Sequence, residues 1–218
     1  MRVNILVGGP KELLPSSEIK LRKAEIWIGV DHGASQLLQW GIIPQIAIGD
    51  FDSTAPNEMS NLQARLNEIK VYPVHKDFTD TQLGVRIAIN EYHPQQIDIF
   101  GATGGRLDHL LANLFLPLQA EFLPYLSKIR FLDLQNLVTY YQPGEYAIQK
   151  DNGKKYLAFV NLTPIKDLTL PDEVYRLDSW SSNIPFSWSS NEFSAPVNHF
   201  SFRSGIVAVI QSSDRKNT

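Results

Sequence analysis

Short apolar runs alternate with amphipathic patterns over the first part of the chain, to about residue 135, and this alternation restricts the fold more than any other feature. Apolar runs predict strands, and apolar residues recurring three and four positions apart predict helices. The predicted strands are 3–9, 25–30, 44–49, 71–74, 96–102 and 129–134, and the predicted helices are 33–41, 57–70, 81–92 and 105–119. Strands that alternate with helices in this way form a mostly parallel sheet with helices on both faces.

After Tyr140 the pattern changes to short runs rich in aromatic and β-branched residues. These runs predict strands at 145–150, 155–160, 173–178, 198–203 and 206–212. An Asn-Gly pair between two such runs, as at Asn152-Gly153, indicates a hairpin. We therefore expect an α/β domain over residues 1–140 and a small antiparallel β-sandwich domain over residues 141–218.

Composition excludes several classes of protein. Twenty basic and 23 acidic residues give a net charge of −3 with no basic block, which argues against nucleic acid as a partner. The absence of cysteine excludes disulfides and thiolate metal sites. The initial apolar run is too short for a secretory signal, and no stretch approaches the ~20 apolar residues that span a bilayer. A cytoplasmic location without a membrane partner is therefore expected.

Aspartates follow three of the predicted strands at their carboxyl ends. They are Asp31, Asp50, Asp52, Asp77 and Asp80. Each one alone is well explained as a helix cap or a solvated turn residue. Because the carboxyl ends of parallel strands share one edge of a sheet, where ligands bind, we expect all of them to meet in one crevice. Such a cluster needs a compensating cation, and its oxygen-only donors favour Mg²⁺ held together with a substrate phosphate.

A glycine-rich turn precedes the helix predicted at 105–119. Its Gly104-Gly105 pair lets the backbone approach a ligand, the start of the helix favours anions, and Arg106 suits phosphate. Gly8-Gly9-Pro10 after the first strand is a weaker signal of the same kind. The Walker A pattern of P-loop enzymes does not occur.

The same helix has two distinct faces at 100° per residue. Arg106, His109 and Asn113 share a polar face, and Asp108 lies on the opposite flank. A lone histidine on such a helix is more often structural than functional. The apolar residues form one stripe that we expect to face the core: Leu107, Leu110, Leu111, Leu114, Phe115 and Leu118.

Four segments, in their order and spacing, resemble the thiamine pyrophosphokinase family. They are GVDHGA (29–34), IGDFDS (48–53), KDFTDTQ (76–82) and GATGGRLDH (101–109). The resemblance continues through SWSSNEF (187–193) and IVAVI (206–210). It implies transfer of an intact pyrophosphoryl group from ATP to thiamine, giving AMP and thiamine diphosphate. It also implies the two domains named above and a homodimer with active sites at the subunit interface.

The resemblance also implies roles for residues of the first domain. Asp50, Asp52 and Asp80 hold Mg²⁺, with Asp31 near the metal and the phosphates. Asp77 and Thr79 line the same crevice.

The glycine-rich segment and the second domain receive the remaining roles. Arg106, Asp108 and His109, beside Gly104 and Gly105, contact the nucleotide or its phosphates. In the second domain Ser190 and Asn191 lie against thiamine, from the partner subunit. The aromatic residue that stacks on thiamine is left open between Phe193 and Trp188.

Two alternative functions remain at this point. The first is another Mg²⁺-dependent, nucleotide-using transferase with an Asp-x-Asp clamp, such as a nucleotide-sugar enzyme, but nothing in the sequence marks a sugar pocket. The second is a noncatalytic nucleotide-binding module, for which the carboxylate cluster has no purpose. The catalytic base and the number of metal ions are also left open.

Overall fold

The computed structural model describes residues 1–51, 56–66, 68–72 and 78–214. The chain forms two compact units, Met1–Leu134 and Gln135–Thr218. The division precedes the expected boundary after residue 140, because β7 (Asn136–Tyr141) pairs along its length with β14 (Val207–Ser212). None of the helices in the described ranges is long and apolar enough to cross a membrane.

The first unit contains a parallel sheet. Its strands are β1 (Arg2–Leu6), β2 (Ile26–Val30), β3 (Ile46–Gly49), β4 (Ile69–Val71), β5 (Gln96–Phe100) and β6 (Ile129–Leu132), in the order β4-β3-β2-β1-β5-β6. Every neighbouring pair among these strands is parallel. The strand predicted at 71–74 overlaps β4 at one residue, and its positions 73 and 74 lie outside the described residues.

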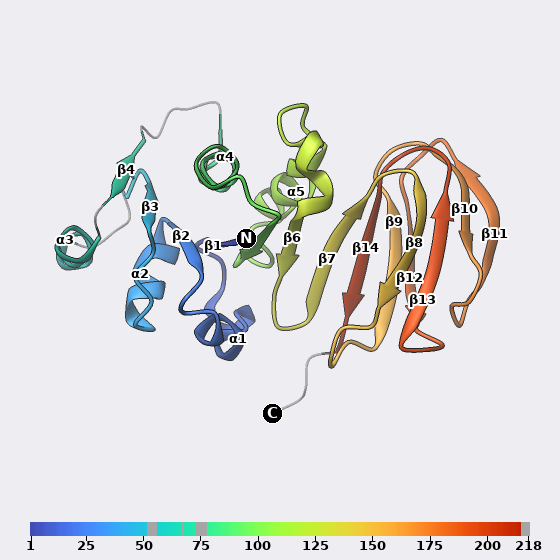
Figure 1. The fold of residues 1–218 in the computed structure, drawn as a ribbon, viewed down its shortest axis with the longest axis horizontal. Helices are drawn as coiled ribbons and strands as arrows, with labels where there is room; N and C mark the ends of the chain where they lie inside the picture. Colours follow the sequence, from blue (N-terminus) through green and yellow to red (C-terminus); the bar gives the residue numbers. More distant parts are fainter. Residues whose placement is uncertain (52–55, 67, 73–77, 215–218) are drawn as a thin grey trace. The chain divides into compact units, whose positions relative to one another are not determined.

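Helices cover both faces of this sheet. They are α1 (Ser16–Leu21), α2 (His32–Gln39), α3 (Pro56–Arg65), α4 (Asp80–Tyr92) and α5 (Leu107–Phe115), with 3₁₀ turns η1 (Lys11–Leu13), η2 (Leu116–Leu118) and η3 (Leu123–Lys128). Figure 1 shows α1 and α2 on one side of the sheet and α4 and α5 on the other. The predicted α/β class is therefore confirmed for this unit. Helix α1 occupies a segment in which the sequence predicted neither a helix nor a strand.

The predicted apolar stripe of α5 is only partly directed to the core: Leu110, Leu114 and Leu118 are half-buried, but the prediction was wrong for the other three residues. The side chains of Leu107, Leu111 and Phe115 are 67%, 42% and 46% exposed. The buried residue of this helix is Asn113, whose Nδ2 donates to the carbonyl oxygen of Ala102 at 2.9 Å. The helix turns its polar face toward the loop after β5, and Leu107, Leu111 and Phe115 therefore point outward.

The second unit is an antiparallel β-sandwich, as predicted. Strands β7, β14, β9 (Tyr156–Asn161) and β12 (Phe186–Glu192) lie side by side in that order, and β8 (Gly144–Gln149), β13 (Val197–Phe202), β10 (Ile165–Leu170) and β11 (Leu177–Ser182) form the other layer. Neighbouring strands pair antiparallel in both layers. The hydrophobic core draws residues from both layers, including Phe159 and Phe200.

The hairpin predicted at Asn152-Gly153 was wrong. Strand β8 pairs with β13, whereas β9 pairs with β14 and β12, so the turn connects the two layers. Gly153 has a φ of +80°, which suits the turn but says nothing about strand pairing. The strand predicted at 173–178 was displaced as well, since β11 begins at Leu177.

Buried Asp98 ties α1 and β6 to the central strand β5. Arg130 donates to its two carboxyl oxygens through Nε at 2.8 Å and Nη2 at 2.7 Å, and Nη1 of Arg22 donates to Oδ2 at 2.5 Å. Burial alone would raise the pKa of Asp98, but the two guanidinium groups outweigh it and hold that pKa below its ordinary value. Paired in this way, the carboxylate stays charged inside the protein.

The loops that leave β1 and β5 touch through glycine. A Cβ atom at Gly9 would lie 2.0 Å from the carbonyl oxygen of Gly101, whereas one at Gly8 would come no closer than 3.6 Å to the Cβ of His32. Gly101 itself has a φ of +74°. The close approach of the two backbones therefore requires glycine at position 9 but not at position 8.

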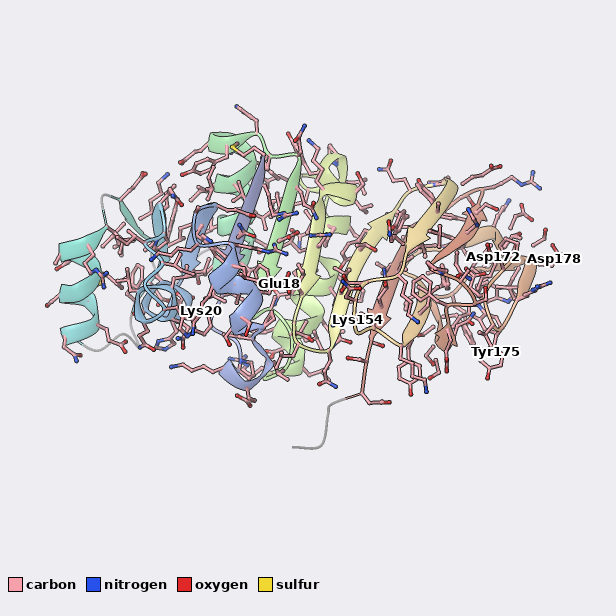
Figure 2. The ribbon with its side chains drawn as sticks, turned by 60° about the horizontal axis from the view of Figure 1, so that its bottom comes forward. Glu18, Lys20, Lys154, Asp172, Tyr175 and Asp178 are labelled. Carbon is pink, nitrogen blue, oxygen red and sulfur yellow. The ribbon has the colours of Figure 1, made fainter. Side chains whose placement is uncertain are left out.

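The second unit buries Glu173 in the loop between β10 and β11. This residue is only 2% exposed, and its sequence neighbour Asp172, labelled with Tyr175 in Figure 2, pairs with His199. Burial raises the pKa of the Glu173 carboxyl to about 7. The Asp172 carboxylate adds to this shift, and the backbone amides of Glu173 and Asp172 oppose it only in part.

Replacing Gly9 by alanine is expected to destabilise the first unit by about 2 kcal/mol, because the new methyl group forces the two loops apart. Gly8→Ala, one position away in the same loop, is the matched control and is expected to stay within about 0.5 kcal/mol of the wild type. Urea unfolding of both variants measures the difference. Equal stability of the two variants would contradict the close approach.

Replacing Glu173 by glutamine is expected to flatten the dependence of stability on pH. Between pH 4.5 and 7 the unfolded wild type has lost a proton that the folded protein still holds, so its stability falls as the pH rises. The loss is expected to be about 2–3 kcal/mol, since one pKa unit corresponds to about 1.4 kcal/mol. Urea unfolding from pH 4.5 to 8, followed by tryptophan fluorescence, compares the two proteins. Parallel profiles would show that Glu173 does not titrate in this window.

Candidate functional site

A cavity of about 1040 Å³ lies in the first unit, beyond the carboxyl ends of its central strands. The order β4-β3-β2-β1-β5-β6 reverses direction between β1 and β5. In open parallel sheets the loops on the two sides of such a reversal diverge and leave a crevice where ligands bind. The cavity therefore has the position that the topology predicts for a binding site.

Three of the aspartates singled out in the sequence line this cavity. They are Asp31 after β2, Asp50 after β3 and Asp80 at the start of α4. Asp52 and Asp77 lie outside the described residues. Within the described ranges, no three His, Asp or Glu side chains stand close enough together to hold a metal ion.

The backbone beside these acids is strained. Asp31 and Phe51 have φ angles of +48° and +54°, which residues other than glycine rarely adopt and which occur most often at functional sites. The amide of Asp31 donates to the carbonyl oxygen of Ile48 at 2.8 Å. A Cβ atom at Gly49 would lie 1.9 Å from Oδ1 of Asp31, so the glycine of the IGD sequence makes room for the Asp31 carboxylate.

Thr79 and Asp80 reach the cavity from the first turn of α4. Thr79 caps this helix: its Oγ1 accepts from the amide of Gln82 at 3.2 Å, and its own amide donates to Oε1 of Gln82 at 2.7 Å. This reciprocal capping box fixes where the helix starts. It therefore also fixes where Asp80, the first helical residue, lies relative to the cavity.

The turn before α5 forms another wall. Gly104 and Gly105 have φ angles of +75° and +67°, and both line the cavity together with Arg106 and His109. Asn113 also lines it, so the polar face expected for this helix points into the cavity.

Asp108 is exposed and is not among the lining residues. Arg106 donates to its carboxylate through Nε at 3.1 Å and Nη2 at 2.6 Å, and this guanidinium lowers the pKa of Asp108. Asp108 therefore contacts Arg106, whose charge it partly offsets.

Several residues that were not predicted as site residues also line the cavity, and three of them carry a charged or aromatic side chain. Lys11 follows the Gly-Gly-Pro turn, His32 follows Asp31, and Phe78 precedes Thr79. Each stands inside or directly beside a segment that the sequence had already marked. Lys11 has the clearest signal, because a basic residue directly after a glycine-rich turn suits a phosphate.

The residues predicted for thiamine lie in β12 and just after it, in the second unit. Ser190 is exposed, with a φ of +61°. The Asn191 side chain is buried, and its amide is used within the protein: Oδ1 accepts from the amide of Tyr175 at 2.9 Å, and Nδ2 donates to the carbonyl oxygen of Tyr175 at 2.7 Å. Phe193 belongs to the hydrophobic core, whereas Trp188 is half-buried at its edge.

Comparison with known proteins covers both units. Residues 18–125 match the family model for the thiamin pyrophosphokinase catalytic domain. Residues 145–207 match the model for the thiamin pyrophosphokinase vitamin B1 binding domain.

Individual relatives match over nearly the whole chain. Thiamine pyrophosphokinase of Bacillus subtilis strain 168 is 39% identical over 214 residues, which cover 97% of this chain and 99% of that protein. A crystal structure of a thiamin pyrophosphokinase family protein from Enterococcus faecalis is 40% identical, with a TM-score of 0.93 over 99% of this chain and 100% of that chain. The crystal structure of the Bacillus subtilis enzyme has a TM-score of 0.85 at 36% identity, again over 99% of this chain and 100% of that one. The chain therefore belongs to the thiamine pyrophosphokinase family, as its sequence motifs predict.

Proposed function

We propose that this protein transfers the pyrophosphoryl group of ATP to the hydroxyl of thiamine, giving thiamine diphosphate and AMP. The observation that carries the proposal is the cavity at the β1/β5 reversal, which brings carboxylates and glycine-rich turns together in a chain of this family. The hydroxyl oxygen attacks the β-phosphorus, and the bond from that phosphorus to the α–β bridging oxygen breaks. Both substrates must therefore be held in line, which is the main task of enzymes that catalyse this type of transfer.

The acids of the cavity fit Mg²⁺. Their donors are carboxylate oxygens at one edge of the sheet, which is the ligand type that Mg²⁺ prefers. Asp50 and Asp80 hold the ion, with Asp52 as a further ligand and Asp31 close to the metal and the phosphates. When bound, Mg²⁺ neutralises charge on the polyphosphate.

The glycine-rich turns and the cations hold the polyphosphate of ATP. Gly104 and Gly105 let the backbone approach it, with His109 and Thr79 on the surrounding wall and Asp77 nearby in the chain. Lys11 and Arg106 offset the negative charge that moves toward the α–β bridging oxygen as AMP leaves. Asp108 keeps Arg106 oriented through their paired hydrogen bonds. An aspartate of the cluster accepts the proton of the thiamine hydroxyl.

Thiamine binds against the exposed part of β12. Ser190 contacts it directly, and the half-buried Trp188 is better placed to stack on its ring than Phe193, which lies in the core. Asn191 has a positioning role, because its side-chain amide holds the backbone of Tyr175 beside this strand.

The active form is a homodimer in which the second subunit supplies the thiamine-binding strand. The exposed apolar stripe of α5, formed by Leu107, Leu111 and Phe115, supports this assembly. A helix of a water-soluble enzyme rarely leaves such a stripe in contact with solvent, and exposed apolar patches commonly mark interfaces.

Substitution of Asp50 by asparagine is expected to reduce turnover about 100-fold or more with unchanged folding, because the cavity loses a charge that balances the metal. The assay contains Mg²⁺, ATP and thiamine and follows both products, which should be AMP and thiamine diphosphate in equal amounts. Asp178→Asn, an exposed acid outside the cavity, is the control and should keep full activity. ADP with thiamine monophosphate would contradict pyrophosphoryl transfer, and ATP binding without turnover would favour a noncatalytic module.

Substitution of Leu111 by glutamate is expected to dissociate the dimer, because it places a charge in the centre of the α5 stripe. Light scattering after size-exclusion chromatography measures the molecular mass. Leu21→Glu changes another exposed leucine, 88% exposed on α1, and should leave the mass unchanged. A monomeric wild type, or an unchanged mass for Leu111→Glu, would rule out this stripe as the interface.

A further inference from the structure

Phe78 is an unusual member of the cavity wall. Within the described part of the chain it is the only Phe, Tyr or Trp that lines the cavity. It directly precedes Thr79, which caps α4, and it is only partly buried. An aromatic ring at this place is therefore accessible to whatever occupies the cavity.

The Phe78 ring is held in place by a cation. The guanidinium carbon of Arg86, two turns into α4, lies 4.0 Å from the ring centroid. Arg86 is itself fixed by Glu121: its Nε donates to Oε1 at 2.5 Å and its Nη2 to Oε2 at 2.8 Å. The hydrogen bonds that Arg86 donates to the Glu121 carboxylate raise the pKa of Arg86, so the guanidinium stays charged.

Arg86 and Glu121 hold the Phe78 ring in one orientation beside the proposed phosphate site. The planar Arg86–Glu121 pair limits the rotation of the guanidinium, and stacking on a fixed guanidinium limits the rotation of the ring. A ring that is already ordered loses little further freedom when a flat ligand stacks on it.

We infer that Phe78 is the stacking platform for the base of the nucleotide, with Arg86 and Glu121 as the residues that position it. The inference rests on the proposed function, which places the nucleotide in this cavity and thiamine against Ser190 of another subunit. Base stacking on an aromatic ring tolerates different bases, because every base has a π-face. Phe78 therefore contributes to affinity for nucleoside triphosphates in general and separates them from polyphosphates that carry no base.

The test compares binding of ATP with binding of inorganic tripolyphosphate, both with Mg²⁺, by calorimetry. Phe78→Ala is expected to weaken ATP about 10-fold or more, in line with the usual contribution of one stacked base. Binding of tripolyphosphate should change less than about 2-fold. Phe78→Trp should restore ATP binding. Arg86→Lys, which loses the paired contact with Glu121, should weaken ATP by an intermediate factor and leave tripolyphosphate unchanged.

Tyr125→Ala is the matched control. Tyr125 also lies under a cation, with Nζ of Lys128 at 5.5 Å from its ring, but it does not line the cavity, and both ligands should bind its variant as they bind the wild type.

Equal loss of ATP and tripolyphosphate in Phe78→Ala would overturn the inference, because the ring would then act only through the shape of the loop. So would unchanged ATP binding, or a raised KM for thiamine alone. These binding measurements do not depend on turnover, so a failure of the proposed reaction would be seen separately.

Discussion

The parallel pairing of β1 with β5 is the constraint on which the site depends. The two strands run in register as far as Leu6 and Phe100, and the amide of Val7 extends the pairing to the carbonyl oxygen of Phe100 at 2.9 Å. Beyond this point the chains leave toward opposite sides of the sheet, since the order of strands reverses here. Gly9 and Gly101 allow the two backbones to touch before they separate, and the cavity opens directly beyond that contact.

Several residues of the cavity wall could be predicted, because the carboxyl ends of parallel strands lie at the same edge of a sheet. Asp31, Asp50 and Asp80 line one cavity because each follows or faces the carboxyl end of a parallel strand, whatever the helices between them do. The helices were harder to place. Helix α1 is too short to show periodicity, with Ile19 as its buried residue. The periodicity of α5 revealed two faces correctly, but it could not tell which face the rest of the chain would cover.

The sequence also did not predict features that depend on residues far away in the chain, because no local pattern reports such contacts. Asn152-Gly153 does form a turn, but the pairing of β8 with β13 is decided some fifty residues away in the sequence. The orientation of the Phe78 ring depends on Arg86 and Glu121, and no local sequence pattern connects these three residues. Buried acids show the same limit: Asp98 is fully buried and is neutralised by Arg22, directly after α1, and by Arg130 of β6, whereas the sequence drew attention to acids at strand ends and to Asp108.

In the second unit, the SWSSNEF segment has an irregular backbone that sets the direction of its side chains. The pairing of β12 with β9 is irregular between Trp188 and Asn191, and Ser190 adopts a positive φ there, so the irregularity directs Ser190 out of the regular pattern of the strand. Asn191 holds this geometry by binding both backbone groups of Tyr175. The loop that carries Tyr175 also buries Glu173, whose raised pKa shows that charging it inside the protein is unfavourable. Burial of the Glu173 carboxyl therefore costs stability next to the segment that carries Ser190.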